Sequence, residues 1–584
     1  MKRTHNCGEL RLANAGQTVT LMGWMENVRE VGANLAFVVL RDYYGTTQVV
    51  LETEEMLAAV KPLNRESTIA VTGLVRERTS KNPKQSTGDI EVVPTEIEVL
   101  GRCQHNSLPF EINRSREADE NQRLKYRYLD LRNPEVKKNI VLRCNVVADI
   151  RKGMTEQGFL EITTPILTSS SPEGARDYLV PSRNHPGKFY ALPQAPQQFK
   201  QLLMTSGFDR YFQIAPCFRD EDARADRSPG EFYQLDMEMA FAGQDDVFGV
   251  IETVFPPIFA ARGKYNVASE APFVRIPFKE ALERFGSDKP DLRIKLELQE
   301  ASELLNDCGF EPFAGQTVKA IVVPNFNKTR KFIDKLCADA EMLSGNKAYW
   351  FRLDENGELV GGISKFLQEK KAGIIEKLGL SNGSFVALSA GKYGAAVKTA
   401  GALRKLIGTQ VEGLMDVERY EFCWIVDFPM YEIGEESGEL EFCHNPFSMP
   451  QGGLKALNEE DPLSINAYQY DLVCNGVELS SGAVRNHNPE IMIRAFEIVG
   501  LGEEDVKAKF PAMYNAFTYG APPHAGIAPG VDRMVMLLAG EDSIREIIPF
   551  PMNKSAQDIM MGAPGEVSQA QLDELHIALV KPEA

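Results

Sequence analysis

The 584-residue chain lacks several features that would place it in a specialised class of protein. No stretch approaches the ~18 consecutive apolar residues of a membrane-spanning helix. No apolar run follows the basic residues near the start, so no secretory signal is expected. The nine cysteines include no pair at CxxC spacing, which predicts reduced thiols and no thiolate zinc site. These absences favour a soluble, cytoplasmic, multidomain protein without a membrane partner.

Excess positive charge is also missing. The chain has 64 Lys and Arg residues against 82 Asp and Glu, a net charge of −18, whereas nucleic-acid-binding domains are usually basic. The imbalance is uneven, because residues 1–105 carry 12 basic and 13 acidic residues. Binding depends on local rather than total charge. The nearly neutral N-terminal segment therefore permits an RNA-facing patch without demonstrating one.

Residues 1–105 have the pattern of a small all-β domain. Five short β-rich runs cover residues 19–28, 35–45, 47–52, 69–78 and 89–100, and glycine-bearing turns separate them. A helical pattern over residues 54–63 follows the third run. Five strands with one helix after the third are typical of an OB-fold barrel. Any other small barrel remains the alternative at this point.

The rest of the chain mixes helices and strands. Residues 106–135 are charged and only weakly apolar, which favours a hinge. Apolar residues at helical spacing begin at Val136 and give way near Gly158 to a β-like run. Residues 136–286 and 416–584 then form two parts of one α/β-rich body. Residues 287–415 contain strands and helices of their own and interrupt this body as an inserted unit.

Three segments of that body combine charge with turn signals. Residues 158–167 lead from a helix into a strand that ends near Pro165. Residues 218–238 form strand, charged loop and strand, with Arg219 placed to pair with a phosphate as a planar fork. Residues 526–538 place small residues and Arg533 before an apolar helix, where an anion is favoured. Each segment alone also fits a purely structural junction, hairpin or turn.

Together and in this order, the three segments resemble the signature motifs of the class II aminoacyl-tRNA synthetases. The match extends over essentially the whole chain and is most similar to the bacterial aspartyl-tRNA synthetases, subclass b. It rests on RLKYRYLDLR, FRDEDARADR, GSDKPDLR and YGAPPHAGIAPGVDR, among others. The sequence matches neither a Rossmann GxGxxG fingerprint nor GxxxxGK[ST], in agreement with a family that holds ATP on an antiparallel sheet.

The resemblance implies an α+β multidomain fold and a two-step reaction. The expected domains are an OB-fold anticodon-binding domain (1–105), a hinge (106–135), a class II catalytic domain on an antiparallel sheet (136–286 and 416–584) and an inserted α/β domain of bacterial type (287–415). L-aspartate would be activated by ATP and transferred to the 3′ end of tRNA(Asp). Pro165 would lie at the interface of a homodimer.

The resemblance also assigns residues to ATP and magnesium. Arg219 and Arg533 would act in catalysis on the phosphates, and Glu221 would read the adenine amino group. The full expected ATP set is Arg219, Asp220, Glu221, Ser228, Glu478, Gly530, Val531, Asp532 and Arg533. Asp471 and Glu478 would hold Mg²⁺, since a hard cation prefers oxygen ligands. Many relatives have glutamine in place of Ser228, which leaves the contact of that loop open.

Aspartate carries a side-chain carboxylate, so its pocket should contain fixed cations. Lys200 and Arg485 match the two cationic contacts of the family, and two cations argue against asparagine or lysine as substrate. The other implied contacts are Glu173, Gln197, Arg219 and His444. His444 alone could equally be a structural hydrogen-bonding residue, and no second ligand stands at zinc spacing from it.

In the OB domain the resemblance implies that an anticodon base stacks on Phe37 and that Gln48 and Glu91 contact base edges. Arg29 and Asn82 would lie near these residues. From the sequence alone Phe37 also fits the barrel core. Val31 stands where relatives that also charge tRNA(Asn) often have histidine, which favours a strict enzyme. The relaxed form, an asparagine–tRNA ligase and a catalytically inactive paralogue remain alternatives.

Overall fold

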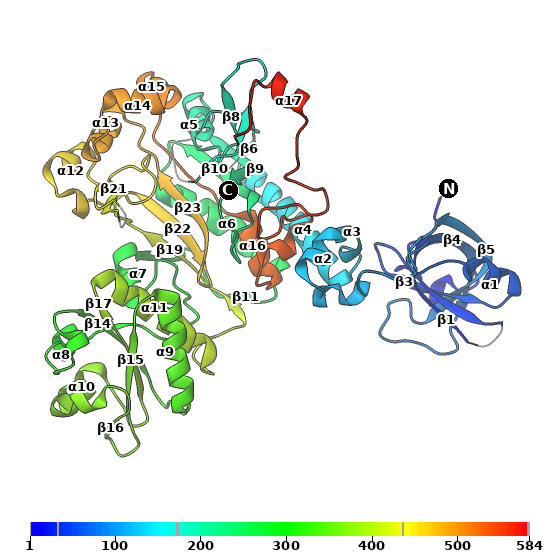
Figure 1. Ribbon diagram of the computed structural model, residues 1–584, viewed down its shortest axis with the longest axis horizontal. Coiled ribbons are helices and arrows are strands. Elements are labelled where there is room, and N and C mark those ends of the chain that lie inside the picture. The colour runs from blue at the N-terminus through cyan, green and yellow to red at the C-terminus, as the bar shows by residue number, and fades with distance from the viewer. Residues whose placement is uncertain (1, 32–33, 171–174, 435–436, 581–584) are drawn as a thin grey trace. The chain divides into compact units, whose positions relative to one another are not determined.

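The computed structural model describes residues 2–31, 34–170, 175–434 and 437–580 (Figure 1). Within these ranges the chain forms two compact units, Met1–Arg114 and Ser115–Ala584. No helix in the described ranges is long and apolar enough to cross a membrane. The fold class expected from the sequence, a small five-stranded barrel followed by a larger body built on an antiparallel sheet in a mixed α+β chain, agrees with the observed topology.

The first unit is a closed five-stranded barrel with strand order β1-β2-β3-β5-β4. Side chains alternate across its wall, as a strand requires. Ala36, Val38 and Leu40 point into the core, whereas Phe37 is only half-buried on the other face. The elements are β1 (Thr18–Glu30), β2 (Ala36–Arg41), β3 (Thr46–Leu51), α1 (Glu54–Val60), β4 (Thr68–Glu77) and β5 (Ile90–Gly101).

The second unit is built on an eight-stranded sheet that is antiparallel through its centre, with parallel pairs only at its two edges. The strands, in sheet order, are β12 (Val274–Pro277), β19 (Phe422–Val426), β22 (Gln469–Cys474), β23 (Val477–Val484), β24 (His524–Ile527), β10 (Gly230–Ala240), β9 (Arg210–Arg219) and β6 (Leu160–Glu161). The strand–loop–strand pattern expected over residues 218–238 lies within the hairpin of β9 and β10.

Long helices cover the sheet and form the main core of this unit. Helix α4 (Pro134–Glu156) begins where the Asn133 side chain accepts a hydrogen bond from the Glu135 N–H, with proline in the first turn. Helix α6 (Gln244–Arg262) buries Phe248, whose ring stacks on Trp424 of β19 at 4.0 Å. Helix α16 (Val531–Ala539) packs against both α4 and β10.

Shorter elements complete the second unit. Its remaining helices are α2 (Glu120–Lys125), α3 (Arg127–Asp130), α5 (Gln197–Thr205), α7 (Phe278–Phe285), α12 (Gly453–Glu459), α13 (Pro489–Ile498), α14 (Glu503–Lys509), α15 (Pro511–Thr518) and α17 (Gln569–Glu574). Three two-stranded ribbons pair β7 (Leu179–Pro181) with β8 (Phe189–Ala191), β11 (Asn266–Val267) with β18 (Arg419–Tyr420), and β20 (Tyr431–Ile433) with β21 (Leu440–Phe442).

Between β12 and β19 the chain forms a separate five-stranded sheet, drawn in green in Figure 1. Its order is β13 (Gln299–Glu300), β14 (Thr317–Val323), β17 (Phe385–Gly391), β15 (Ala348–Leu353) and β16 (Leu359–Val360). One face packs on α9 (Arg330–Ser344) and α11 (Tyr393–Gln410), and the other on α8 (Ser302–Leu305) and α10 (Lys371–Leu378). This sheet lies inside the segment interpreted as an insertion.

Some local features differ from the sequence pattern. The β-like run after Gly158 forms a strand only at Leu160–Glu161, and further along the Thr164 N–H donates to the Gln213 side chain instead of to a strand backbone. The helical pattern of residues 569–580 ends at Glu574, and His576 has a positive φ of 56°. Within the segment interpreted as a hinge, α2 and α3 bury charged side chains in salt bridges, which the low apolar content did not indicate.

Candidate functional site

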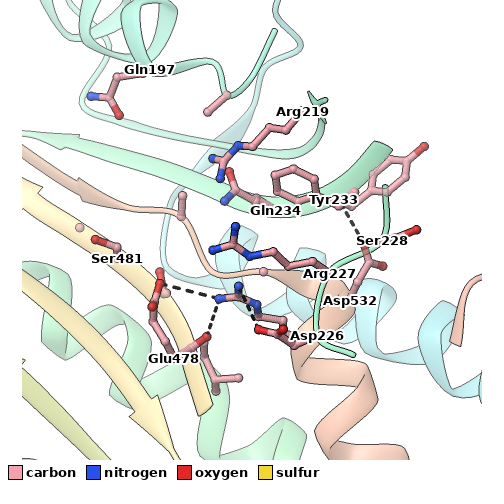
Figure 2. Close-up of a pocket in the computed structure, with 18 of the residues that line it drawn as sticks. Gln197, Arg219, Asp226, Arg227, Ser228, Tyr233, Gln234, Glu478, Ser481 and Asp532 are labelled. Atoms are coloured by element: carbon pink, nitrogen blue, oxygen red, sulfur yellow. Dashed lines mark hydrogen bonds and ion pairs between the residues drawn. The ribbon is translucent and has the colours of Figure 1, made fainter. Parts of the chain in front are cut away.

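Residues far apart in the sequence line one cavity of about 280 Å³ on the central strands of the second unit (Figure 2). The predicted residues that line it are Gln197, Lys200, Arg219, Glu221, Ser228, Glu478, Arg485, Gly530, Asp532 and Arg533. They come from α5, from the β9–β10 hairpin, from β23 and from the start of α16. The antiparallel sheet thus gathers the second and third sequence motifs around one space.

At one wall of the cavity, two cations are paired with two carboxylates. Lys200 Nζ lies 2.6 Å from Asp236 Oδ1 and 3.5 Å from Glu238 Oε2. Arg485 donates to both oxygens of Glu238, from Nε at 2.8 Å and from Nη2 at 3.2 Å. All four side chains are buried. The wall is therefore a charge-balanced network, not the free cationic pair suggested by the sequence.

The two carboxylates of this network have different electrostatics. Burial raises the pKa of Asp236, and the ammonium of Lys200 opposes that rise without overcoming it. Burial also raises the pKa of Glu238, but the charges of Arg485 and Lys200 outweigh it and the net shift is downward. Asp236 Oδ2 has no hydrogen-bond partner within the described part of the chain. A buried acceptor of this kind is costly unless a ligand donor satisfies it.

Sequence reasoning gave no role to Asp236 and Glu238, which lie in the segment 218–238. They stand two residues apart in β10, so both point to the same side of the sheet. The sequence did contain a signal for them, namely two acidic residues at this spacing in an apolar strand. A buried carboxylate needs cationic partners, so such a pair indicates a charged network. The cations that supply them, Lys200 and Arg485, lie 36 and 247 residues away from those partners in the sequence.

A group of arginines lines the opposite part of the cavity. The guanidinium of Arg219 lies over the Phe232 ring at 5.0 Å, and its Nε has no hydrogen-bond partner among the described residues. Arg227 donates from Nη1 to Glu221 Oε2 at 2.8 Å. In Figure 2 the side chains of Arg219, Gln234 and Arg227 point into the same space. Such a cluster suits a polyanion, since each guanidinium can bind phosphate oxygens as a fork.

Arg533, from the third motif, also lines this cavity. It donates from Nη1 to the backbone oxygen of Glu478 at 3.0 Å, and its Nη2 lies 3.4 Å from Asp226 Oδ2. Asp226, Arg227, Phe232 and Gln234 also line the cavity. These four residues were missed by sequence reasoning, because they belong to the hairpin and only its folded geometry brings them to the cavity.

Asp532 connects the second motif to the third. Its Oδ2 accepts from the backbone N–H of Tyr233 at 2.8 Å, and its Oδ1 accepts from Arg143 Nε at 3.0 Å. Burial raises the pKa of the Asp532 carboxyl, against the lowering effect of Arg143. Because protein donors already satisfy both oxygens, this side chain positions the start of α16 and Arg533 beside it.

A pair of carboxylates lies at the β22–β23 edge of the site. The strands are antiparallel neighbours, and a bulge after Leu472 offsets their register. Asp471 is buried and its Oδ1 has no hydrogen-bond partner in the described ranges. Burial, followed by the charge of Glu478, holds the pKa of Asp471 well above its ordinary value. Burial also raises the pKa of Glu478, but Lys289 and Arg533 outweigh that effect and lower it.

This pair fits a divalent cation. An unsatisfied carboxylate oxygen next to a second carboxylate is stabilised when a cation binds between them. No group of three or more His, Cys, Asp or Glu side chains gathers as a metal cage in the part of the chain that the structure describes. Mg²⁺ suits such a site, because it takes one or two carboxylates and completes its shell with water and phosphate oxygens.

Four predicted residues lie elsewhere or were not described. The His444 ring packs edge-on against Phe428 at 5.0 Å, and its neighbour Asn445 lines the cavity in its place. Burial lowers the pKa of His444. The side chain of Val531 is buried in the main core, and Asp220 is not part of the cavity lining. Glu173 lies outside the described residues.

In the first unit, the predicted anticodon residues other than Asn82 form two pairs on β1, β2, β3 and β5. Arg29 and Phe37 are cross-strand partners, and the guanidinium lies 5.1 Å from the ring centroid. Gln48 Nε2 donates to Glu91 Oε2 at 3.0 Å. Arg76, which sequence reasoning missed, donates to Glu91 Oε1 at 2.7 Å. The half-buried position of Phe37 on the outer face leaves its ring available to a base.

The remaining predicted positions are simpler. The Asn82 side chain accepts from the backbone N–H of Lys84 at 3.1 Å and so caps its own turn. Val31 is 47% exposed next to residues 32–33, which are not described. Pro165 is exposed after β6.

Comparison with known proteins identifies the family of the chain. A family described as tRNA synthetases class II (D, K and N) matches residues 119–554, and an OB-fold nucleic acid binding domain matches residues 19–100. The chain belongs to the class II tRNA synthetases. The aspartate–tRNA ligase of Streptomyces avermitilis is 53% identical over 100% of this chain and 99% of its own length. The aspartate–tRNA(Asp/Asn) ligase of Acidiphilium cryptum is also 53% identical, with the same coverage.

Solved structures confirm the class II synthetase fold at much lower identity. Asparaginyl-tRNA synthetase from Pyrococcus horikoshii, complexed with asparaginyl-adenylate, is 18% identical with a TM-score of 0.59, over 95% of this chain and 100% of that one. An aspartyl-tRNA synthetase described as putative, from Leishmania major, has a TM-score of 0.60 at 18% identity, over 94% of each chain. The residues that line the cavity all lie within the range 119–554 that matches the class II synthetase family.

Proposed function

We propose that this class II synthetase attaches L-aspartate to tRNA(Asp) with consumption of ATP. The observation that carries the proposal is the wall formed by Lys200 and Arg485 with Asp236 and Glu238, at one side of a cavity whose other side carries three arginines. A substrate carboxylate suits the first side and a polyphosphate suits the second. Full-length relatives at 53% identity that bear the name aspartate–tRNA ligase support the same reaction.

In the proposed first step, a carboxylate oxygen of aspartate attacks the α-phosphorus of ATP and pyrophosphate leaves. A 3′-terminal hydroxyl of the tRNA then attacks the carbonyl of aspartyl-adenylate and AMP leaves. Such a displacement needs alignment and neutralisation of charge more than covalent help from the protein. Arg219 would bind the α-phosphate and Arg533 the far phosphate, with Glu221 reading the adenine amino group. The unsatisfied Arg219 Nε and its place in the cavity support this assignment.

At the amino-acid end, Lys200 and Arg485 would bind the side-chain carboxylate of aspartate. Gln197, whose Nε2 has no partner among the described side chains and main chain, would bind a nearby polar atom of the substrate. The unsatisfied oxygen of Asp236 is suited to the substrate ammonium. We keep Glu173 and His444 among the proposed aspartate-binding residues only because the sequence resembles the family at these positions. An asparagine side chain carries no charge, so it would gain less than a carboxylate from the N–H groups of Lys200 and Arg485 that the network leaves available.

Asp471 and Glu478 would hold Mg²⁺ on the ATP phosphates. The bound cation would supply neutralisation of the phosphate charge during the displacement. The unsatisfied Asp471 Oδ1 and the proximity of a second carboxylate support the assignment. Protein oxygen ligands complemented by phosphate oxygens are the arrangement that Mg²⁺ prefers.

The OB unit, residues 1–105, would bind the anticodon, with Phe37 stacking on a base and Gln48 and Glu91 reading base edges. We assign catalysis to residues 136–286 and 416–584, and leave 287–415 as the inserted domain. Because the reaction supplies the ribosome with charged tRNA, we place the protein in the cytoplasm. We also propose a homodimer, because Pro165 lies among exposed apolar residues that a partner subunit would cover: Leu160, Ile166, Leu167 and Leu179.

The decisive experiment measures charging with labelled aspartate on purified tRNA(Asp) and tRNA(Asn) side by side. Charging of tRNA(Asp) alone is the expected result and agrees with valine at position 31. Relatives with the name aspartate–tRNA(Asp/Asn) ligase at the same 53% identity favour a second candidate, the relaxed enzyme. Equal charging of both tRNAs would establish that candidate. Pyrophosphate exchange that depends on asparagine but not aspartate would refute the proposed substrate.

A further inference from the structure

The segment that joins α7 to the inserted sheet, residues 286–298, is fixed from two sides. Buried Arg404 of α11 donates to three of its backbone oxygens, those of Asp291, Ile294 and Leu296, at 2.6–3.0 Å. At the other side, a Cβ on Gly476 in the β22–β23 turn would lie 3.1 Å from the Cβ of Asp291. The segment is therefore a firm support for any side chain that it directs toward the site.

Lys289 is such a side chain. Its backbone N–H donates to Ser287 Oγ at 3.0 Å, which fixes the turn, and its Nζ lies 2.7 Å from Glu478 Oε2. The other oxygen, Glu478 Oε1, lies 3.7 Å from Arg533 Nη1. Both oxygens of this carboxylate therefore face cationic side chains, one from the inserted segment and one from the third motif.

The neighbouring carboxylate has no such partner. Asp471 Oδ1 is without a hydrogen bond among the residues that the structure describes, although it is buried. Of the two carboxylates that fit the cation, one is already neutralised by an ammonium and the other is not. An ammonium and a divalent cation compete for the same oxygen, because neither can approach Glu478 Oε2 closely while the other is there.

We propose that Lys289 is a stand-in cation for Glu478: it neutralises and orients this carboxylate in the free enzyme and releases it when the divalent cation enters with ATP. Lys289 is then a positioning residue that keeps metal affinity low until the nucleotide contributes its own phosphate oxygens. The inference rests on the proposed function for the identity of the nucleotide. The competition itself depends only on the contact between Lys289 and Glu478.

The contact could alternatively be an ordinary exposed ion pair, since the Lys289 side chain is 42% exposed. Such pairs contribute little. An ordinary pair would leave the affinity of the site for a divalent cation within about twofold when lysine is removed. If Lys289 is a stand-in cation, its removal should raise the affinity of the site for a divalent cation by more than this, because two adjacent carboxylates are then left without the ammonium. The two interpretations therefore differ in a binding measurement that does not involve turnover.

The test uses the full-length protein without nucleotide and follows free Mn²⁺ by electron paramagnetic resonance. Lys289→Met should bind Mn²⁺ about tenfold more tightly than the wild type, in the range of common site-to-site coupling. Lys289→Arg should stay close to the wild type because it keeps the charge. Lys507→Met, which removes an exposed lysine paired with Glu503 and Glu504, is the matched control. Glu478→Gln removes the proposed metal-binding carboxylate, so the Mn²⁺ that this variant still binds measures binding elsewhere on this acidic chain.

A non-hydrolysable ATP analogue should reduce the difference between Lys289→Met and the wild type, because with nucleotide bound Lys289 has released Glu478 in the wild type and the variant has no lysine to release. Unchanged or weaker Mn²⁺ binding by Lys289→Met without nucleotide would overturn the proposal. If Lys289→Met does not fold, Lys289→Gln takes its place with the same expected result. Aspartate-dependent pyrophosphate exchange by the wild type is measured in parallel, so failure of the proposed function would be seen independently of the Mn²⁺ result.

Discussion

Glu238 holds Arg485 through two hydrogen bonds, of 2.8 and 3.2 Å, with both side chains buried in the wall of the cavity. This bidentate contact fixes the plane of the guanidinium and leaves its remaining N–H groups oriented toward the cavity. It also binds the two residues into one electrostatic unit. A change to either one should therefore affect substrate binding and folding stability together.

Arg485→Ala should reduce aspartate-dependent pyrophosphate exchange by at least about a hundredfold, because loss of one partner of a buried charge pair costs several kcal/mol. The thermal midpoint should also fall, since Glu238 is left as a buried carboxylate whose ion pair with Arg485 is lost and whose contact with Lys200 is longer, at 3.5 Å. Arg485→Lys keeps the charge but loses the fork, and should recover stability more than exchange. Exchange at wild-type rate in Arg485→Ala would contradict the assigned role.

Gly526→Ala tests the contact between Glu238 and Arg485 from the neighbouring strand β24, where Gly526 lies opposite Glu238. A Cβ at this position would lie 1.9 Å from Glu238 Oε2 and 2.3 Å from the Met237 backbone oxygen. One methyl group should therefore displace Glu238 and tilt Arg485, with a larger rise in KM for aspartate than for ATP. Gly249→Ala, where the same Cβ meets no neighbour, is the control for a glycine substitution in this unit. Equal effects on both KM values would argue against a local displacement.

Phe37→Ala separates the two units by function. The ring lies on the outer face of the barrel beside Arg29, away from the buried core of Val38 and Leu40. Loss of one base–aromatic stack costs about 1–3 kcal/mol in nucleic-acid binding, so the KM for tRNA should rise. Pyrophosphate exchange needs no anticodon contact and should stay unchanged. If exchange slowed as much as charging, the division of labour between the units would be wrong.

Glu546→Gln should destabilise the second unit in a pH-dependent manner. Glu546 accepts from two nitrogens of Arg123, at 2.8 and 2.9 Å. Burial raises the pKa of this carboxyl, but Arg123, Arg116 and Arg127 outweigh it and hold the pKa below 4.5. The ionised carboxylate is thus favoured in the folded state, and its contribution is complete above the unfolded pKa. It is lost as the pH falls through the folded value.

The cost of Glu546→Gln should be about 2 kcal/mol near pH 7 and should shrink steadily below about pH 4.5. Thermal midpoints at pH 7.5, 5.5 and 4.0 would measure it. Glu135→Gln, which removes a partner of Lys138 on the exposed surface of α4, should change little at any pH. A constant difference between wild type and Glu546→Gln across this range would exclude the ionic explanation.

The sequence predicted the barrel and the strand–turn–helix elements well, because their signals are local. Alternation in residues 36–41 and the turns around it suffice to define β2, and glycine before an apolar helix suffices to define the start of α16. The partners of Lys200 and Arg485 could not be found in this manner. Whether a cation is free or neutralised depends on contacts between distant strands, and no local pattern encodes them.

The same limit applies to Lys289. The motif GSDKPDLR was noted for its resemblance, yet nothing in eight residues states that the lysine contacts a carboxylate 189 positions later. The sequence also left open whether Phe37 belongs to the barrel core or stacks on a base. Alternating side chains define the two faces of a strand but do not show which face points into the barrel. Packing of Ala36, Val38 and Leu40 in the barrel decides that question.

The inserted unit leaves and re-enters the catalytic sheet at β12 and β19, which are adjacent parallel strands with Val274 opposite Cys423. The pairing of these strands therefore does not depend on the inserted sheet, and a gene could gain or lose the unit without breaking the ladder around it, provided that enough residues remain for the crossover that parallel neighbours require. The boundary of a viable excision is set by Lys289 instead. A shortened protein that keeps residues 286–291 would preserve the contact to Glu478, whereas one cut at the strand ends would lose it.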